Sequence, residues 1–444
     1  MDFTLFDYFT DPVLRAPTIG SMLMGLAAGL IGVVVYLRKE SLLGETLSHA
    51  AFPGAIAGIF VASFLGFTED ITTLFMLLGA GITAFASIYL VNWLQVKVRV
   101  PSDAALCFVL AATFGVGITA ASQMQFTHAA EYRRMLSLLY GQTATMTDFH
   151  IALYGILATS IIVILALLHK EVKIVAFDRN YAFSLGIPVK AIESIFFFLV
   201  VLAVIIGIRT VGVVLMSAML IAPAVSARQF TNRLSTVFLL AGLFGICAGF
   251  IGNYLSLTLT HSFSSATTRV SIPTGPTIVL TAATLCLFAL ICAPERGLAS
   301  RAWRIMLFRY RCLCENILKC IWRLSPEDGT LTQELVKYFN TSPSLVRLAL
   351  HSLKRQGWIQ NISHQVWRLT PDGKIKAEKI VRLHRLWEVY LADYLGVGAE
   401  KVHRNAEEME HIITPELEEA LTKLLKDPKT DPHHQPIPSK NPVL

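Results

Sequence analysis

Long apolar runs fill the first two thirds of the chain and stop near Pro294. A helix of about 20 apolar residues can cross the hydrocarbon core of a bilayer. Candidate runs of this kind occupy residues 17–37, 50–67, 71–94, 104–121, 149–168, 192–208, 211–225, 237–259 and 277–292. The pattern predicts an all-α polytopic membrane domain, with about eight or nine transmembrane helices, over residues 1–295.

Beyond Pro294 the pattern changes to short amphipathic stretches, and about one residue in four is charged instead of about one in ten. Residues 331–340 and 345–357 have helical spacing and are joined by a short turn, with Pro343 at the first helical position. Residues 359–369 alternate between apolar and polar side chains, as the strands of a hairpin do. These elements predict a soluble winged helix-turn-helix domain at 310–373, after a cytoplasmic linker at 296–309.

Basic residues gather in alternate connections between the apolar runs, at 38–39, 97–99, 170–179, 228–233 and from 296 onward. Because such residues are retained on the cytoplasmic side, nine crossings put the N-terminus outside and the soluble part in the cytoplasm. We therefore expect a multi-pass protein of the bacterial inner (cytoplasmic) membrane. The net charge of +7 is partly explained by these loops, so it does not by itself imply nucleic acid binding.

Glu45 and His49 are ionisable residues at the start of an apolar run, four positions apart. In a helix this spacing puts both side chains on one face. Ionisable groups in membrane segments are costly and usually face a cavity or a pathway, and a carboxylate with an imidazole can bind a divalent transition metal. The alternative is that Glu45 caps the helix end and His49 hydrogen-bonds a backbone carbonyl.

A short polar segment, 177–188, separates two apolar runs on the predicted cytoplasmic side. Asp178 or Asn180 could cap a helical turn that Gly186 and Pro188 end, so that the segment, taken alone, is a capped loop. The chain has no Gly-x-x-x-x-Gly-Lys-Ser/Thr loop for nucleotide phosphates. We therefore expect no nucleotide site and no enzymatic activity in this chain, with ATP hydrolysis on a separate subunit.

Three segments carry a family resemblance. They are Gly44-Glu45-Thr46-Leu47-Ser48-His49-Ala50, Pro223-Ala224-Val225-Ser226-Ala227-Arg228 and Thr274-Gly275-Pro276-Thr277. The chain resembles the permease subunits of ABC-type metal-ion importers, the group handling zinc, manganese and iron, over nearly all of residues 15–293.

This resemblance implies that Glu45 and His49 line a metal path, opposite the same pair from a second permease subunit. Glu45 stands where aspartate is commoner, which leaves the metal preference open. The resemblance also implies an ABC ATPase subunit, docked on a coupling helix that contains Asp178, Ala182 and Gly186. An extracytoplasmic metal-binding protein would deliver the cargo.

The second predicted helix of the winged domain would enter the major groove of DNA. Its early residues Ser342, Ser344 and Arg347 are candidates for contacts with base edges, whereas Lys354 and Arg355 are candidates for phosphate contacts. The alternative is a winged helix that makes only protein contacts, because a fold alone does not fix function.

Histidines and glutamates with helical spacing follow the winged domain. They are His384, Glu388, His403, Glu407, Glu410 and His411. The first two are four positions apart, and the last four share one helical face. Nitrogen and oxygen ligands between two helices suit Mn2+ or Fe2+ better than a thiolate zinc site, with Zn2+ left open. We expect a helical metal-binding and dimerisation domain at 374–438 and a tail at 439–444; the alternative is a solvated acidic face.

Segments 369–373, 382–388, 403–411 and 436–438, with the winged helix, resemble the diphtheria toxin repressor family of metal-dependent transcriptional regulators. The resemblance implies one metal site from His384, Glu388 and His403, and a neighbouring site from Glu407, Glu410 and His411. The family draws a further ligand from its first helix. There this chain has Asn316 beside Glu315, and Lys319 at a position that some manganese-type members fill with an acid.

Together these features predict the permease subunit of an ATP-driven manganese, iron or zinc importer, carrying a C-terminal metal-dependent repressor that binds operator DNA as a dimer. A second interpretation makes the C-terminal domain an intramolecular metal-sensing gate that does not bind DNA. A third makes the whole chain a membrane-bound sensor without transport. The sequence leaves open the physiological metal, the homo- or heterodimeric pairing of permease subunits, the operator sequence and the release of the C-terminal domain by cleavage.

Overall fold

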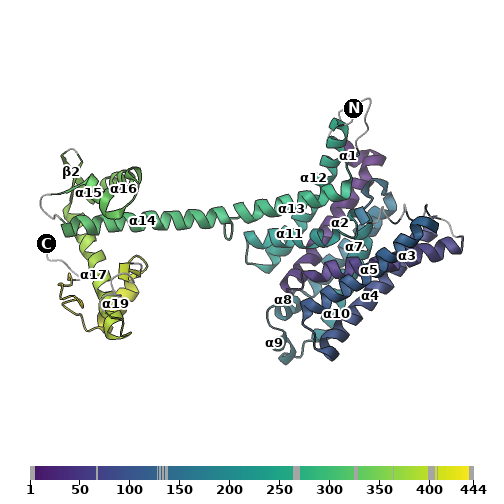
Figure 1. The fold of residues 1–444 in the computed structure, drawn as a ribbon, viewed down its shortest axis with the longest axis horizontal. Helices are drawn as coiled ribbons and strands as arrows, with labels where there is room; N and C mark the ends of the chain where they lie inside the picture. Colours follow the sequence, from purple (N-terminus) through teal and green to yellow (C-terminus); the bar gives the residue numbers. More distant parts are fainter. Residues whose placement is uncertain are drawn as a thin grey trace. The chain divides into compact units, whose positions relative to one another are not determined.

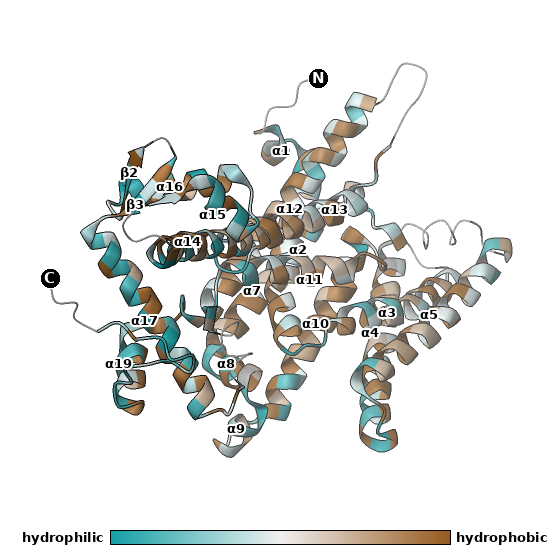
Figure 2. Cartoon of the chain, turned by 60° about the vertical axis from the view of Figure 1, so that its left-hand side comes forward, coloured by the Kyte–Doolittle hydropathy of each residue, from teal (hydrophilic) through white to brown (hydrophobic). Residues whose placement is uncertain are grey.

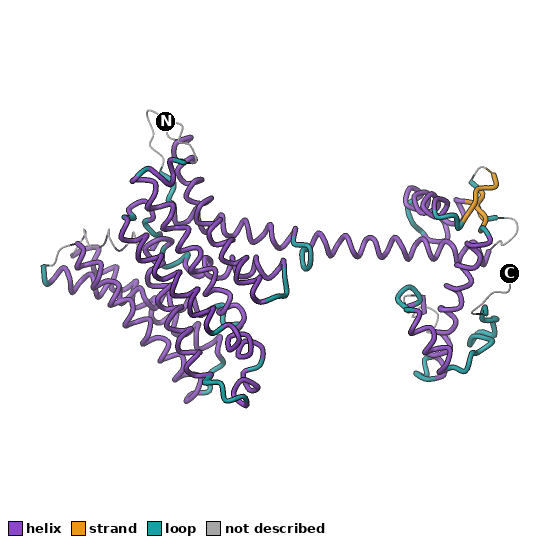
Figure 3. Tube along the Cα trace, turned by 180° about the vertical axis from the view of Figure 1, so that it is seen from behind, coloured by secondary structure: helices purple, strands orange, loops and turns teal. Residues whose placement is uncertain are grey.

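The chain divides into two compact units, Met1–Ser300 and Arg301–Leu444. The computed structural model describes residues 6–66, 69–127, 129, 132, 135, 139–263, 271–324, 329–363, 365–398, 406–407 and 409–439. In this part of the chain the first unit is helical, and the strands, orange in Figure 3, belong to the second unit. The predicted combination of a polytopic helical membrane domain and a soluble domain is therefore confirmed.

The helices of the first unit are labelled in Figure 1. They are α1 (Asp7–Thr10), α2 (Pro12–Leu37), α3 (Leu42–Phe64), α4 (Glu69–Trp93), the π-helix η1 (Leu94–Val98), α5 (Ser102–Thr127), the 3-10 helix η2 (Thr143–Thr145), α7 (Asp148–Leu167), α8 (His169–Phe177), α9 (Arg179–Ser184), α10 (Val189–Val211), α11 (Met216–Phe230), α12 (Leu234–Phe263) and α13 (Thr274–Cys292). Among the described residues, eight helical spans are long and apolar enough to cross a membrane, and Figure 2 shows their apolar character in brown.

Helix α2 packs against α12 and α11 with backbones in close contact. A side chain at Gly25 would collide with the carbonyl of Gly245 on α12, and a side chain at Gly245 would collide with the carbonyl of Gly25. Small residues that allow such an approach are typical of helix interfaces in membranes, where van der Waals packing drives association. Of the candidate spans among the described residues, α2 is the most buried, and its side chains form part of the core of the unit.

The apolar run 211–225 does not form one long helix. Val211 is the last residue of α10, Gly212 has φ of 99°, and α11 has 15 residues, so it is about 22 Å long. This helix is too short to be counted among the eight candidate spans. The predicted number of transmembrane helices, eight or nine, depends on whether this helix is included.

Hydrogen bonds before and after α11 join its flanking residues to two different segments of the first unit. Before its start, Gln142 donates its backbone N–H to the carbonyl of Arg209 at 2.8 Å, and Thr143 Oγ1 donates to the carbonyl of Thr210 at 2.7 Å. After its end, Asn232 Nδ2 donates to Glu295 Oε2 at 2.8 Å. We call these the Thr143 end and the Glu295 end. The described residues thus contain eight candidate spans, with α11 as a shorter helix between these two sets of contacts.

The second unit consists of most of α14 (Leu298–Leu324), followed by β1 (Thr330–Leu331), α15 (Thr332–Phe339), α16 (Pro343–Arg355), β2 (Ile359–Ser363), β3 (Val366–Leu369), α17 (Pro371–Asp393) and α19 (Pro415–Leu424). The strands form an antiparallel sheet in the order β1-β3-β2, with Thr330 opposite Trp367 and Ile359 opposite Leu369. The predicted wing at 359–369 is present. The strand β1 was not predicted, and the residues assigned to a linker are helical from Leu298.

The core of this winged-helix part lies where α14, α15 and α16 meet the sheet. Ile317, Ile321, Leu335, Leu350 and Ile359 are almost completely buried in it. Helix α14 therefore has two roles. One face packs in this core, while Glu315 and Lys319 on the other face contact His411 and Glu410.

Candidate metal centre

His384 and Glu388 lie on α17, one turn apart. The helix starts at Pro371, and Thr370 Oγ1 accepts a hydrogen bond from the backbone N–H of Gly373 at 3.0 Å, which satisfies one of the free donors of the first turn. His384 Nε2 is 3.1 Å from Glu388 Oε1. Both side chains are buried, so neither is part of a solvated acidic face.

Glu410 brings a second carboxylate to the same ring. Its Oε2 is 2.5 Å from His384 Nδ1, so each ring nitrogen of His384 faces a carboxylate oxygen. Burial alone would lower the pKa of His384, but the hydrogen bonds to Glu388 and Glu410 outweigh it, and the pKa is raised above its ordinary value. The helical spacing predicted the pair on α17, whereas the contact with Glu410 comes from the tertiary fold.

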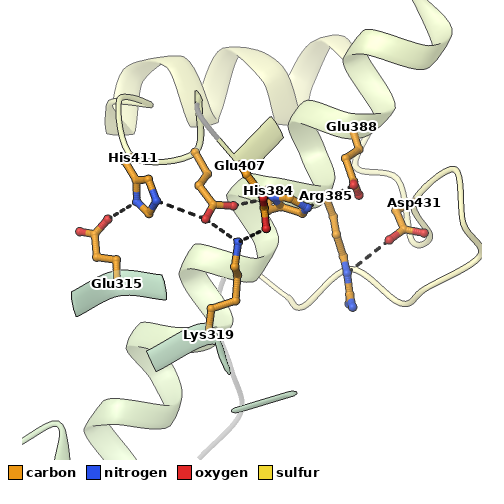
Figure 4. A network of polar contacts seen from close by, with 9 residues as sticks. Glu315, Lys319, His384, Arg385, Glu388, Glu407, His411 and Asp431 are labelled. Atoms are coloured by element: carbon orange, nitrogen blue, oxygen red, sulfur yellow. Dashed lines mark hydrogen bonds and ion pairs between the residues drawn. The ribbon is translucent and has the colours of Figure 1, made fainter. Parts of the chain in front are cut away.

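Lys319 and Glu315 reach the cluster from α14 (Figure 4). Lys319 Nζ is 2.7 Å from Glu410 Oε1 and 3.9 Å from Glu407 Oε1. Burial alone would raise the pKa of Glu410, but its hydrogen bond with His384 and the charge of Lys319 outweigh it and lower the pKa. Glu410 therefore links members of the two metal sites that the family resemblance keeps apart.

His411 is held by Glu315, whose Oε2 is 2.6 Å from His411 Nδ1. Arg311 Nε also lies 3.3 Å from Glu315 Oε1. Burial would raise the pKa of Glu315, but the hydrogen bond and charge of His411, together with Arg311, lower it. Asn316, the residue at the position of the family's further ligand, has a buried Oδ1 without a hydrogen-bond partner in the described structure.

The fit to divalent ions differs between the two predicted sites. His384, Glu388 and Glu410 present one imidazole and two buried carboxylates, which is a donor set suited to Mn2+ or Fe2+. His403, the third residue predicted for this site, lies outside the described residues. The Glu407 and Glu410 pair instead holds the ammonium group of Lys319. Within the described ranges, no group of three or more ligating side chains is arranged so that it could hold a metal ion.

In the first unit, Glu45 lies in the first turn of α3 and His49 one turn later. Glu45 is half-buried, whereas His49 is buried and contacts the ring of Phe114 edge-on, with ring centroids 4.4 Å apart. His49 Nδ1 is buried and has no hydrogen-bond partner among the described residues. The alternative predicted a hydrogen bond from His49 to a backbone carbonyl, and Nδ1 makes no such bond among the described residues.

The predicted coupling segment forms the helix α9. Asp178 Oδ1 accepts a hydrogen bond from the backbone N–H of Tyr181 at 2.9 Å, so Asp178 is the cap that the sequence left open between two residues. Ala182 is buried, and Gly186 has φ of 74°, a conformation that glycine adopts without strain. Phe183 is 76% exposed, which leaves a large apolar side chain of this helix without a covering partner in the described structure.

The five residues predicted to contact DNA are exposed on or next to α16. They are Ser342, Ser344, Arg347, Lys354 and Arg355. Val346, Leu350 and Leu353 point the opposite way, into the core of the second unit. The helix thus separates a buried apolar face from an exposed face that carries these polar residues together with Leu345 and Leu348, and the hairpin of β2 and β3 packs beside it. Sequence periodicity alone predicted this division.

Comparisons with known proteins agree with both units. Residues 10–293 match the ABC 3 transport family, and residues 370–439 match the iron dependent repressor, metal binding and dimerisation domain. A probable metal transport system membrane protein of Chlamydia trachomatis is 31% identical over 442 residues, which cover 97% of each chain. The manganese transport system membrane protein MntC of Bacillus subtilis is 35% identical, with 84% of this chain and 82% of that protein covered.

Among solved structures, PsaBC from Streptococcus pneumoniae, in complex with Fab, has a similar fold. The TM-score is 0.56 at 23% identity, and the match covers 68% of this chain and 98% of that one. The chain therefore belongs to the ABC 3 transport family, as a multi-pass membrane permease that carries an iron-dependent-repressor metal binding and dimerisation domain at its C-terminal end.

Proposed function

We propose that this chain is the permease subunit of an ATP-driven importer of divalent metal ions, and that its second unit represses transcription when the imported metal is abundant. The observation that carries the proposal is the buried cluster of His384, Glu388 and Glu410 in the same unit as the exposed polar face of α16. The cluster and the exposed face of α16 belong to one compact unit, which supports the proposal that metal binding and DNA binding are coupled.

His384 and Glu388, with His403, would hold the regulatory ion, while Glu410 supplies a further carboxylate next to the imidazole. When bound, a divalent cation supplies a charge that carboxylates and a neutral imidazole can share. Manganese is favoured as the cargo and effector by the manganese transport relative MntC, and Fe2+ and Zn2+ are the competitors to test.

The transport path would run past Glu45 and His49, opposite the same pair of a second permease subunit. The buried, unpartnered Nδ1 of His49 supports this role, because a buried polar atom without a partner is costly unless it serves a function. We further propose that an ABC ATPase subunit docks on α9, around Asp178, Ala182 and Gly186, and that an extracytoplasmic metal-binding protein delivers the ion.

Orientation follows from the two ends of the first unit. Arg228 and Arg233 flank the Glu295 end, and Arg38 is near the start of α10, with its Nη1 3.6 Å from Glu193 Oε1. Because basic connections stay in the cytoplasm, we propose that the Glu295 end and the C-terminal unit are cytoplasmic, in the inner membrane of a bacterium.

DNA binding is tested by gel shifts of the full chain in detergent, with promoter DNA of the importer genes and with or without Mn2+ or Fe2+. We expect a metal-dependent shift that His384→Ala and Arg347→Ala both abolish. Arg347→Ala should leave metal binding intact, whereas His384→Ala should reduce it. A chain that binds metal but never shifts DNA would favour the intramolecular gate instead.

Transport is tested in vesicles that contain the chain and its ATPase subunit. We expect ATP-dependent Mn2+ uptake that His49→Ala reduces at least tenfold, because the change removes the proposed imidazole ligand from the path. The matched control is His261→Ala, which changes an exposed histidine in the last turn of α12. Equal uptake by the two variants would show that His49 is not part of the path.

A further inference from the structure

A lysine occupies the place where the family resemblance puts a second metal ion. Lys319 Nζ contacts Glu410 Oε1 at 2.7 Å and lies 3.9 Å from Glu407 Oε1. The side chain of Lys319 is 17% exposed, and that of Glu410 is fully buried. A buried carboxylate needs a compensating charge. Here the chain itself supplies that charge.

The third residue predicted for this second site, His411, is engaged through one of its ring nitrogens. His411 Nδ1 is hydrogen-bonded to Glu315, whereas its Nε2 has no hydrogen-bond partner among the described residues and lies 3.5 Å from the same Glu410 oxygen that Lys319 holds. All three predicted ligands of the second site, Glu407, Glu410 and His411, therefore face a partner from α14.

A protonated lysine has three donors and no acceptor, so it cannot act as a metal ligand. A divalent ion bound by Glu407 and Glu410 would lie within a few ångströms of the ammonium group, in a region where burial weakens screening by water. It would also compete for the Glu410 oxygen that Lys319 holds. Lys319 and a second divalent ion therefore exclude one another, whereas Oε2 of Glu410 remains directed at His384.

We propose that Lys319 is a built-in cation that replaces the second divalent ion, so that the C-terminal unit binds one ion per chain, at His384 and Glu388, instead of two. This inference rests on the proposed function, because it assumes that the unit binds a divalent ion. Lys319 also fixes Glu410 in the absence of metal, which leaves the His384 site as the one that responds to metal concentration.

The test counts Mn2+ bound to the full chain in detergent, from the electron paramagnetic resonance signal of free Mn2+ during titration. Glu45→Gln and His49→Ala are included in every sample, so that the transport path does not contribute. We expect one ion in this background and two after the further change Lys319→Met, with the spectral splitting of a coupled manganese pair. Lys319→Arg keeps the positive charge and should keep one ion.

The matched control is Lys379→Met, which removes an exposed lysine that lies 3.8 Å from Glu418 in the same unit. It should leave the count at one. The difference between the background and Lys319→Met decides the inference: one additional ion supports it, and an unchanged count overturns it. The number of Mn2+ ions bound by the Glu45→Gln and His49→Ala background tests the proposed function separately. If this background binds no Mn2+, metal sensing by the second unit is contradicted.

Thermal unfolding of each variant with and without Mn2+ provides a readout independent of the count. Lys319→Met should be destabilised without metal, because Glu410 loses its charged partner, and should gain more stability from Mn2+ than the background does. A Lys319→Met chain that is folded without metal and gains no more from Mn2+ than the background would overturn the inference.

Discussion

At the scale of single residues, the ionisation of His384 links the metal centre to the stability of the metal-free unit. The ring faces Glu388 on its own helix, Glu410 on the segment before α19 and the charge of Lys319 from α14. The raised pKa of His384 means that the folded state binds a proton more tightly than the unfolded state does. Its contribution to stability is present below the ordinary value of 6.5 and is lost as the pH rises through the raised value.

The carboxylates of Glu315 and Glu410 act in the opposite direction. Their lowered pKa values stabilise the folded state above the ordinary value of 4.5, and this stabilisation is lost as the pH falls through the lowered values. We therefore expect the metal-free unit to be most stable between about pH 4.5 and 6.5. Hydrogen exchange of α17 in the full chain with a chelator, corrected for intrinsic rates, measures this. His384→Gln should remove the decline on the alkaline side; a decline that persists would contradict the assignment.

Loss of the Arg382 side chain should destabilise the second unit strongly. It is 3% exposed, donates to the carbonyl of Pro438 at 2.8 Å and to Asp427 Oδ1 at 3.1 Å, and lies 3.7 Å from the buried Glu418. Removing one partner of a buried ion pair typically costs about 3–5 kcal/mol. We expect Arg382→Met to lower the free energy of unfolding by roughly 3 kcal/mol in denaturant titrations.

The control for Arg382→Met is Lys374→Met, which changes an exposed cationic residue on the same helix. Its effect should stay within about 0.5 kcal/mol. Similar losses for the two variants would show that the buried network does not stabilise the unit. The contact with Pro438 also explains the structural role of the proline-containing segment 436–438, because its last carbonyl accepts a hydrogen bond from Arg382.

At the scale of elements, α9 is a short helix whose ends are fixed by the chain itself. Asp178 caps its start, Gly186 follows its end, and Arg179 Nη2 lies 2.9 Å from Glu193 Oε2 on α10. Helices this short are not stable alone, so these contacts are what holds the helix in place. The exposed side chain of Phe183 is then available for a partner.

We expect Phe183→Ser to weaken co-purification of the ATPase subunit and to reduce transport at least tenfold, because an exposed aromatic anchor often dominates an interface. The fold should be unaffected, since the side chain makes no core contact. Phe6→Ser, at a residue that is 72% exposed before α1, is the control. Full ATPase recovery with Phe183→Ser would place the docking surface elsewhere.

At the scale of the whole molecule, α11 determines the topology. If this short helix runs between the Thr143 end and the Glu295 end, the first unit makes an odd number of traverses and its termini lie on opposite sides of the membrane. The connections at 38–39, 97–99, 170–179 and 228–233 and the stretch from 296 then lie on one side, as retention of positive charge in the cytoplasm requires, whereas Arg133, Arg134 and Arg209 lie on the other.

Labelling of one introduced cysteine per variant, in intact cells, tests this topology. A membrane-impermeant maleimide should modify Ala144→Cys directly, because this exposed residue is at the Thr143 end. It should modify Ser184→Cys, which is exposed at the end of α9, only after permeabilisation. The parent chain with its native cysteines is the blank. The reverse pattern would invert the proposed orientation.

Features that depend on local periodicity follow from the order of the amino acids alone. Apolar runs specify the membrane helices, because each must satisfy its own backbone hydrogen bonds in lipid. The spacing of His384 and Glu388 puts them on one face of α17, and the polar positions of α16 lie opposite its buried ones. These relations extend over one or two turns, so they can be read without knowing the fold.

Only the tertiary structure decided how distant segments meet. Glu315 and His411 are 96 positions apart, and Lys319 and Glu410 are 91 apart, yet both pairs are in contact. The short strand β1 pairs with β3 across more than thirty residues, and α11 is recognisable as a traverse only from the contacts at its two ends. Such contacts depend on which helices pack together. Residue spacing within one helix does not say which other helix that face will contact. The family resemblance marks Lys319 as a departure at a ligand position, but only the tertiary structure shows that its ammonium group contacts Glu410.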